Sequence, residues 1–224
     1  MPTARESLRN PLVATYREAY GAGADVAVEL VAGAAVAQAW ERESALDGMT
    51  VGELAAHLAR SVLQVAWYLD GPLTPDAALV DAAGYYADLS GTTDASSELN
   101  TGVRARSAET AAAGRDVLVR DVTAARERLR ERLPREPADR RMTVRHHGHT
   151  LLLDEYLATR CVELAVHTED LALSVRSDVR APAATTAVAV DVLVAAARRR
   201  QGDVAVLHAL ARRERDDVDA LRVV

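Results

Sequence analysis

The fold is decided by residues 152–175, which read LLDEYLATRCVELAVHTEDLALSV. Wound as a helix at about 100° per residue, this stretch has an apolar face. That face is formed by Leu153, Leu157, Leu164, Val166 and Leu171. The side that we expect to face solvent carries Asp154, Glu155, Ala158, Thr168 and Glu169. The stretch therefore predicts one long helix that packs against others.

A second polar stripe runs between the apolar positions of this helix. Its members are Tyr156, Arg160, Glu163, His167, Asp170 and Ser174. An ordinary amphipathic helix has a single polar face, and burying Glu, His and Arg together is costly unless they are paired or bind a metal. Because Glu163 and His167 are four residues apart, their Cβ atoms lie about 5–6 Å apart on one face. Both side chains can therefore reach one cation.

An earlier helix, predicted from Thr50 to about Leu69, shows the same pattern. Thr50 and Glu53 form a capping box at its start. An inward stripe of His57, Ser61, Gln64 and Tyr68 follows beside Leu54, Leu58 and Val65. We expect His57 to supply a third ligand, because two histidines and one carboxylate leave an open coordination position, as catalytic zinc sites do. On these residues alone, the alternative is a core histidine beside a chance Glu-His pair.

The rest of the chain predicts further helices with connections of varied length. We expect one long helix within 11–41, helices over about 102–132, 181–200 and 203–213, an irregular segment over 76–100, and a short hairpin or loop over 140–150. Four long helices indicate an all-α protein built on a four-helix bundle. We assign residues 1–176 to the bundle and residues 177–224 to a C-terminal helical appendage.

Composition excludes several functional classes. The net charge of −6 argues against nucleic acid as a partner, since phosphate binding needs a basic face. No lysine occurs, so a Schiff-base or phosphate-loop lysine is excluded. The single cysteine, Cys161, excludes an intramolecular disulfide. No apolar run indicates a signal core or a membrane span, so we expect a cytoplasmic monomer or homodimer with no membrane partner.

Two segments resemble a known family. Residues 45–59, ALDGMTVGELAAHLA, and residues 159–175, TRCVELAVHTEDLALSV, resemble the mycothiol-dependent maleylpyruvate isomerase family of the DinB-like superfamily. Residues 202–224 resemble the tail of many members, whereas 76–150 carry little of the likeness. The resemblance implies a DinB-like bundle with zinc ligands at His57, Glu163 and His167. The family's motif around the Glu and His ligands also contains an Arg and an Asp, which correspond to Arg160 and Asp170. We expect these two residues to support the ligands.

The resemblance implies an enzyme that uses zinc, or another divalent metal, and a small thiol, mycothiol, as cofactors. The expected reaction is an isomerisation or S-transfer on a small electrophilic substrate, with the thiol sulfur as nucleophile. One alternative is a hydrolase that uses a zinc-bound water on the same ligands. Another is a bundle that keeps the ligands but is not catalytic, which would be favoured if no cleft reached the metal.

A few other residues invite a functional interpretation. His146, His147 and His149 could form a second metal site, although histidines in a polar loop are usually solvated. We interpret Cys161 and His208 as ordinary packing residues. Arg212 and Arg213 lie in a charged run that is usually solvated, although one arginine of this tail could hold an anionic substrate at the bundle mouth.

Overall fold

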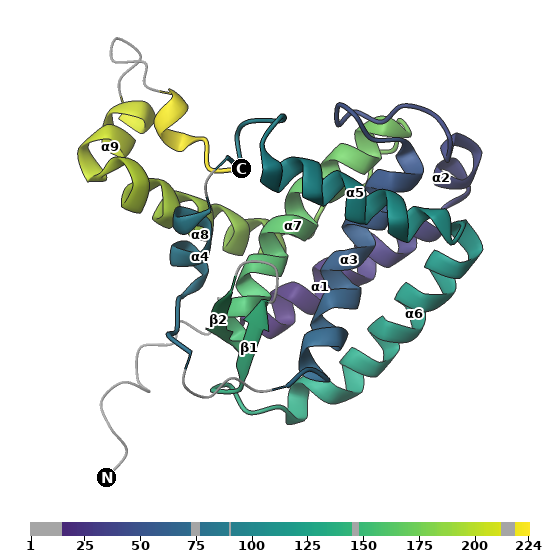
Figure 1. The fold of residues 1–224 in the computed structure, drawn as a ribbon, viewed down its shortest axis with the longest axis horizontal. Coiled ribbons are helices and arrows are strands. Elements are labelled where there is room, and N and C mark those ends of the chain that lie inside the picture. The colour runs from purple at the N-terminus through teal and green to yellow at the C-terminus, as the bar shows by residue number, and fades with distance from the viewer. Residues whose placement is uncertain (1–14, 73–76, 90, 145–147, 212–217) are drawn as a thin grey trace.

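The computed structural model describes residues 15–72, 77–89, 91–144, 148–211 and 218–224 (Figure 1). These residues form nine α-helices and one small hairpin. The helices are α1 (Tyr16–Ala32), α2 (Ala34–Ala39), α3 (Val51–Leu69), α4 (Ala82–Asp88), α5 (Glu98–Ala112), α6 (Arg115–Arg132), α7 (Leu153–Ser174), α8 (Ala183–Gln201) and α9 (Asp203–Ala211). The strands β1 (Arg141–Val144) and β2 (His149–Leu152) pair antiparallel. The prediction of an all-α protein is confirmed.

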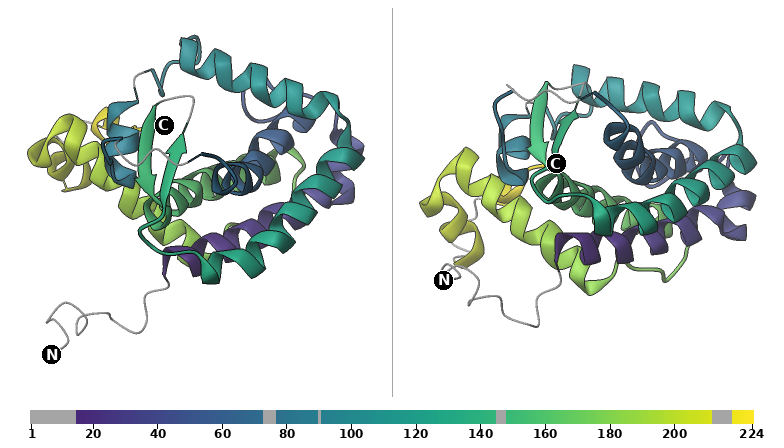
Figure 2. Two further views of the ribbon diagram at one scale, coloured as in Figure 1. Left: turned by 60° about the horizontal axis from the view of Figure 1, so that its bottom comes forward. Right: turned by 90° about the horizontal axis from the view of Figure 1, so that it is seen from below.

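Helices α1, α3, α6 and α7 form the four-helix bundle. Each packs against two neighbours in the order α1, α7, α3, α6 and back to α1. Their facing sides carry fully buried Tyr20, Leu54, Leu58, Leu157 and Leu164. Figure 2 shows α5 crossing α3 on the side away from α1, while α8 and α9 extend from the α7 side. The bundle therefore presents α3 and α7 side by side, with α5 packed against α3.

The helix predicted from Thr50 is confirmed as α3. The Thr50 hydroxyl accepts from the Glu53 backbone N–H at 3.2 Å, and the Glu53 carboxylate accepts from the Thr50 N–H at 2.7 Å. This capping box satisfies backbone donors that the first helical turn leaves without partners. The helix that begins near Leu152 is likewise confirmed as α7, so both helices that carry inward polar stripes are present.

Three predicted boundaries are wrong. The helix expected within 11–41 is not continuous: α1 ends at Ala32, before Gly33, whose backbone is extended with ψ 148°, and α2 ends at Ala39. The helix predicted over 102–132 is two helices, because Gly114, at φ 87° and ψ 156°, turns the chain between α5 and α6. The segment 76–100 is not irregular throughout. It contains α4, whose first turn is capped by the Asp81 carboxylate at 2.7 Å from the Gly84 N–H.

The side of α7 expected to face solvent is partly buried. Ala158 and Thr168 are at most 1% exposed, so their placement on a solvent face was wrong. The reason is that α8 packs along this side of α7 and also touches α1. The buried Thr185 hydroxyl of α8 donates to the Ala19 carbonyl oxygen at 2.7 Å, which joins α8 to the bundle. The boundary drawn at residue 176 stays a prediction.

The short hairpin lies at the N-terminal end of α7. Met142 pairs with Leu151 and Thr143 with Thr150, and the buried side chains of Met142 and Leu151 join the core. The hairpin alternative for residues 140–150 is thus the correct one, although 145–147 lie outside the described residues. None of the described helices combines the length and the apolar composition needed to cross a membrane.

Candidate metal centre

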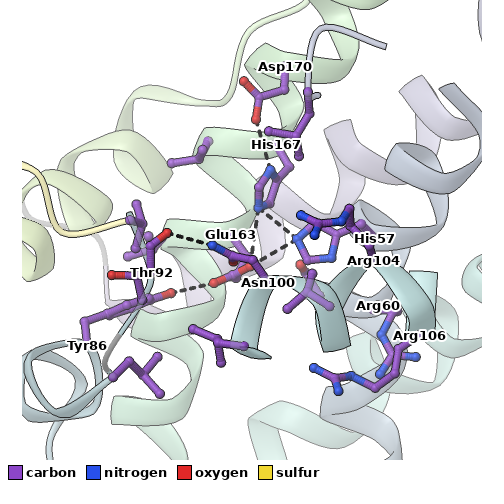
Figure 3. A pocket seen from close by; sticks show the side chains of 18 of the residues that line it. His57, Arg60, Tyr86, Thr92, Asn100, Arg104, Arg106, Glu163, His167 and Asp170 are labelled. Atoms are coloured by element: carbon purple, nitrogen blue, oxygen red, sulfur yellow. Dashed lines mark hydrogen bonds and ion pairs between the residues drawn. The ribbon is translucent and has the colours of Figure 1, made fainter. Parts of the chain in front are cut away.

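Two neighbouring helices bring three possible metal ligands together. His57 on α3 faces Glu163 and His167 on α7, and one donor atom from each residue lies within 4.8 Å of the other two (Figure 3). The two imidazole Nε2 atoms are 2.9 Å apart. Glu163 Oε2 lies 3.7 Å from Nε2 of His57 and 3.5 Å from Nε2 of His167. All three side chains are largely buried, with 14–20% of their area exposed.

These separations fit a zinc ion. Zn–N and Zn–O bonds of ~2.0–2.2 Å in a tetrahedron place neighbouring ligand atoms ~3.3–3.6 Å apart. The two oxygen-to-nitrogen distances are close to this, and the two imidazoles would need to separate slightly. Two nitrogens and one carboxylate oxygen are also a donor set that zinc prefers. The role of the three residues as ligands stays a prediction.

Further side chains orient the two imidazoles. Asp170 Oδ2 lies 3.0 Å from Nδ1 of His167, one turn along α7. Ser107 on α5 places its Oγ 3.4 Å from Nδ1 of His57 and donates to the Val103 carbonyl oxygen. Each histidine thus has a partner for the ring nitrogen that faces away from the site, which is the usual arrangement around metal-binding histidines.

Without a metal, the two histidines carry different charges. Burial, together with the neighbouring His167, lowers the pKa of His57 to about 3. Burial also opposes charge on His167, but hydrogen bonds to Asp170 and Glu163 raise its pKa to about 9. Although burial works against it, His167 and Arg160 hold the pKa of Glu163 well below its usual range. At neutral pH, protonated His167 therefore donates to neutral His57 beside an ionised Glu163.

The α3 stripe and the middle of the α7 stripe face one pocket of about 680 Å³. Its wall includes His57, Ser61, Gln64 and Tyr68 of α3, and Arg160, Glu163, His167 and Asp170 of α7. Apolar side chains also line it, among them Leu99 and Val103 of α5, Val162 and Val166 of α7, and Leu89 after α4. The three possible ligands therefore lie at the surface of a cavity large enough for a small organic molecule.

Arg160 is a buried cation in this wall, with 6% of its area exposed. Its guanidinium donates to Gln64 Oε1 at 3.1 Å and to Thr159 Oγ1 at 3.2 Å, and it stacks over the Tyr156 ring at 5.0 Å. The nearby Glu163 carboxylate pairs with the two histidines. Burial opposes the charge, but Tyr156 and Glu163 raise the pKa of Arg160, so it stays ionised.

Among the described residues, the others considered from the sequence do not join this site. Cys161 is fully buried and burial raises the pKa of its thiol to about 12. His149 lies on β2, with Nε2 at 4.0 Å from Asp88 Oδ2, and does not line the pocket. His208 is half-buried on α9, also away from the pocket. His146, His147, Arg212 and Arg213 lie outside the described residues.

Sequence reasoning missed two residues of the site. Tyr86 on α4 donates from its hydroxyl to Glu163 Oε1 at 2.7 Å, and Ser107 on α5 contacts His57. Tyr86 lies in the segment that we expected to be irregular. Its only sequence signal is Asp81, a helix-capping residue, followed by the apolar run AAGYYA. Ser107 lies in a helix whose composition gives no clear inward face.

A protein-family model matches the part of the chain that contains the site. The family model described as mycothiol maleylpyruvate isomerase N-terminal domain matches residues 20–172. The matched range includes His57, Tyr86, Glu163 and His167. No curated protein and no solved structure matches the chain. The resemblance stated from the two sequence segments is thereby confirmed.

Proposed function

Because this chain belongs to the mycothiol maleylpyruvate isomerase N-terminal domain family, we propose that it is a metal- and thiol-dependent enzyme. The proposed reaction is an isomerisation or S-transfer on a small electrophile, with mycothiol as the thiol. The observation that carries the proposal is the convergence of His57, Glu163 and His167 on the wall of a 680 Å³ pocket. A pocket that reaches these side chains favours catalysis over a non-catalytic bundle.

The chain's own residues would prepare the site for a metal. His57, Glu163 and His167 would hold it, with zinc as the proposed ion, and Asp170 and Ser107 would fix the two imidazoles. A bound zinc would supply a Lewis acid that favours the deprotonated form of a thiol ligand. With three ligands supplied by the protein, the metal would retain capacity to bind a thiol or another small molecule.

The nucleophilic sulfur would come from the cofactor. The only protein thiol, that of Cys161, is fully buried, has a raised pKa and does not line the pocket. A neutral thiol is a weak nucleophile, so Cys161 is unsuited to the reaction. The apolar wall formed by Leu99, Val103 and Val166 would exclude water around the reacting groups.

Arg160 would bind the substrate electrostatically. A buried guanidinium is costly to desolvate, and its surroundings supply neutral acceptors from Gln64 and Thr159. An anionic or carbonyl oxygen of the electrophile would complete these interactions. Arg160 would thus orient the electrophile beside the metal ligands.

Calorimetry with the zinc-loaded protein tests the proposal. Mycothiol should bind with release of about one proton, because a metal-bound thiol is deprotonated. The release is measured from the binding enthalpy in buffers of different ionisation enthalpy. Glu163→Ala, which removes a ligand, should lose this binding. His208→Ala, which removes a histidine outside the pocket, should behave as the unaltered protein.

Cobalt substitution gives a second measurement. Thiolate coordination to Co²⁺ adds a sulfur-to-metal charge-transfer band that water does not produce. If mycothiol and other small thiols give neither proton release nor this band, the thiol-dependent function is wrong. Metal-dependent hydrolysis of a test ester or amide would then favour the zinc-water hydrolase.

A further inference from the structure

Tyr86 reaches the candidate metal centre from a helix outside the four-helix bundle. It lies on α4, is 2% exposed, and donates from its hydroxyl to Glu163 Oε1 at 2.7 Å. In Figure 3 it approaches Glu163 from the side opposite to His57. The same hydroxyl oxygen lies 3.1 Å from the Thr159 carbonyl oxygen. The phenol is therefore held against the backbone of α7 as well as against the carboxylate.

Contacts behind Tyr86 fix its position. Its ring packs edge-to-face against Tyr85, with ring centroids 5.2 Å apart. The Arg200 guanidinium of α8 donates to the Tyr86 carbonyl oxygen at 2.5 Å. Neither contact involves a candidate metal ligand. They therefore hold the phenol in this direction whether or not a metal is bound.

The two oxygens of Glu163 consequently have different surroundings. Oε1 accepts the hydrogen bond from Tyr86, whereas Oε2 is the oxygen near both histidine Nε2 atoms, at 3.7 and 3.5 Å. A carboxylate with one oxygen engaged in this way presents only the other to a cation. Burial and the adjacent Glu163 charge raise the pKa of Tyr86 well above its ordinary value, so the phenol remains a donor.

We propose that Tyr86 is a positioning residue that makes Glu163 a one-oxygen metal ligand. Its hydrogen bond occupies Oε1, turns Oε2 towards the two imidazoles, and keeps the coordination position facing the pocket open for a small molecule. The inference rests on the metal site of the proposed function. It adds a residue that shapes the geometry of that site without touching the ion.

Tyr86→Phe tests the role, because it removes only the hydroxyl. In the cobalt-loaded protein, Glu163 should then bind through both oxygens and raise the coordination number. Four-coordinate Co²⁺ absorbs visible light more strongly than five- or six-coordinate Co²⁺, so the visible bands should weaken. Loss of an outer partner of a ligand should also weaken metal affinity by roughly 10–100-fold.

Tyr156→Phe is the matched control. It also removes a hydroxyl from a fully buried tyrosine near the pocket, but this hydroxyl has no hydrogen-bond partner among the described residues. The Tyr156→Phe spectrum and affinity should match those of the unaltered protein. If Tyr86→Phe also matches it, the positioning role is wrong while the metal site stands. If the unaltered protein binds no cobalt, the metal site is wrong and the inference with it.

Circular dichroism shows whether Tyr86→Phe folds. If it does not, infrared spectroscopy of the unaltered protein still tests the proposal. In the unaltered protein, the difference spectrum between zinc-loaded and metal-free forms contains the carboxylate stretches of Glu163. One-oxygen coordination gives a wide separation between the asymmetric and symmetric stretches, and this is the expected result. A narrow separation, typical of binding through both oxygens, would overturn the proposal.

Discussion

At the level of single residues, the metal prediction depends on three donor atoms that can be removed one at a time. The purified protein should carry about one divalent ion per chain, as expected of one three-ligand site. His57→Ala, Glu163→Ala and His167→Ala should each abolish most of this content, measured by elemental analysis. His208→Ala serves as the histidine control and should keep the ion. Full metal content in all three ligand variants would contradict the assignment.

Two substitutions of Asp170 separate the effect of its hydrogen bond to His167 from the effect of its charge. Asp170→Ala should weaken metal affinity by roughly 10–100-fold, because His167 loses the acceptor on Nδ1 that fixes its ring. Asp170→Asn keeps an amide oxygen that can accept the same bond and should recover most of the affinity. Competition with a chelator of known affinity measures both. Equal affinities for the Ala variant and the unaltered protein would remove Asp170 from the site.

The pH dependence of metal binding follows from the two histidines. With pKa values of about 9 for His167 and about 3 for His57, only His167 carries a proton that metal must displace between pH 5 and 8. Metal affinity should therefore rise about tenfold per pH unit over this range and level off above the pKa of His167. Titrations with zinc at several pH values measure the slope. Affinity that is independent of pH would show that His167 is neutral in the metal-free protein.

At the level of helices, glycine conformation decides where α5 ends and α6 begins. Gly114 adopts φ 87° and ψ 156°, a region that other residues rarely enter, and nothing lies within 4 Å of the position of an added Cβ. Gly114→Ala should therefore destabilise the protein by about 1–3 kcal/mol through backbone strain alone. Urea denaturation measures the change in free energy of unfolding.

Gly102 inside α5 provides a control for which the expected change in stability has the opposite sign. An added Cβ there meets only the flexible end of the Arg106 side chain, at 3.0 Å. Gly102→Ala should stabilise the helix by up to about 1 kcal/mol, because alanine has the higher helix propensity. If both substitutions change stability in the same direction, backbone strain at Gly114 is not the cause.

These elements also show how far sequence reasoning reaches. Helices α3 and α7 could be predicted because their signals, a capping box in α3 and a regular spacing of apolar residues in α7, lie within each helix. The polar stripes on the two helices then indicated His57, Glu163 and His167. The break at Gly114 was missed because the sequence on both sides of it favours helix. Tyr86 was missed because α4 has only seven residues and its contact with Glu163 joins positions 77 residues apart. Such a contact depends on tertiary packing.

At the level of the whole molecule, residues 177–224 are tied to the bundle and to the site. Thr185 bonds to α1, Val188 and Val192 are buried, and Arg200 holds Tyr86. A chain truncated after residue 176 should therefore unfold at lower urea concentration and bind the dye ANS on its exposed α7 side. It should also lose metal more readily, because α4 loses its support. Unchanged stability and metal retention would show that the bundle is complete by itself.

The two facing histidines are 110 residues apart in the chain. At ~5–20 residues per second of synthesis, His57 leaves the ribosome about 5–20 seconds before His167. During that interval the candidate site lacks His167, and for most of it Glu163 as well. The ion would therefore be acquired after translation has passed α7. The metal supply of the cell would then influence the finished protein rather than the emerging one.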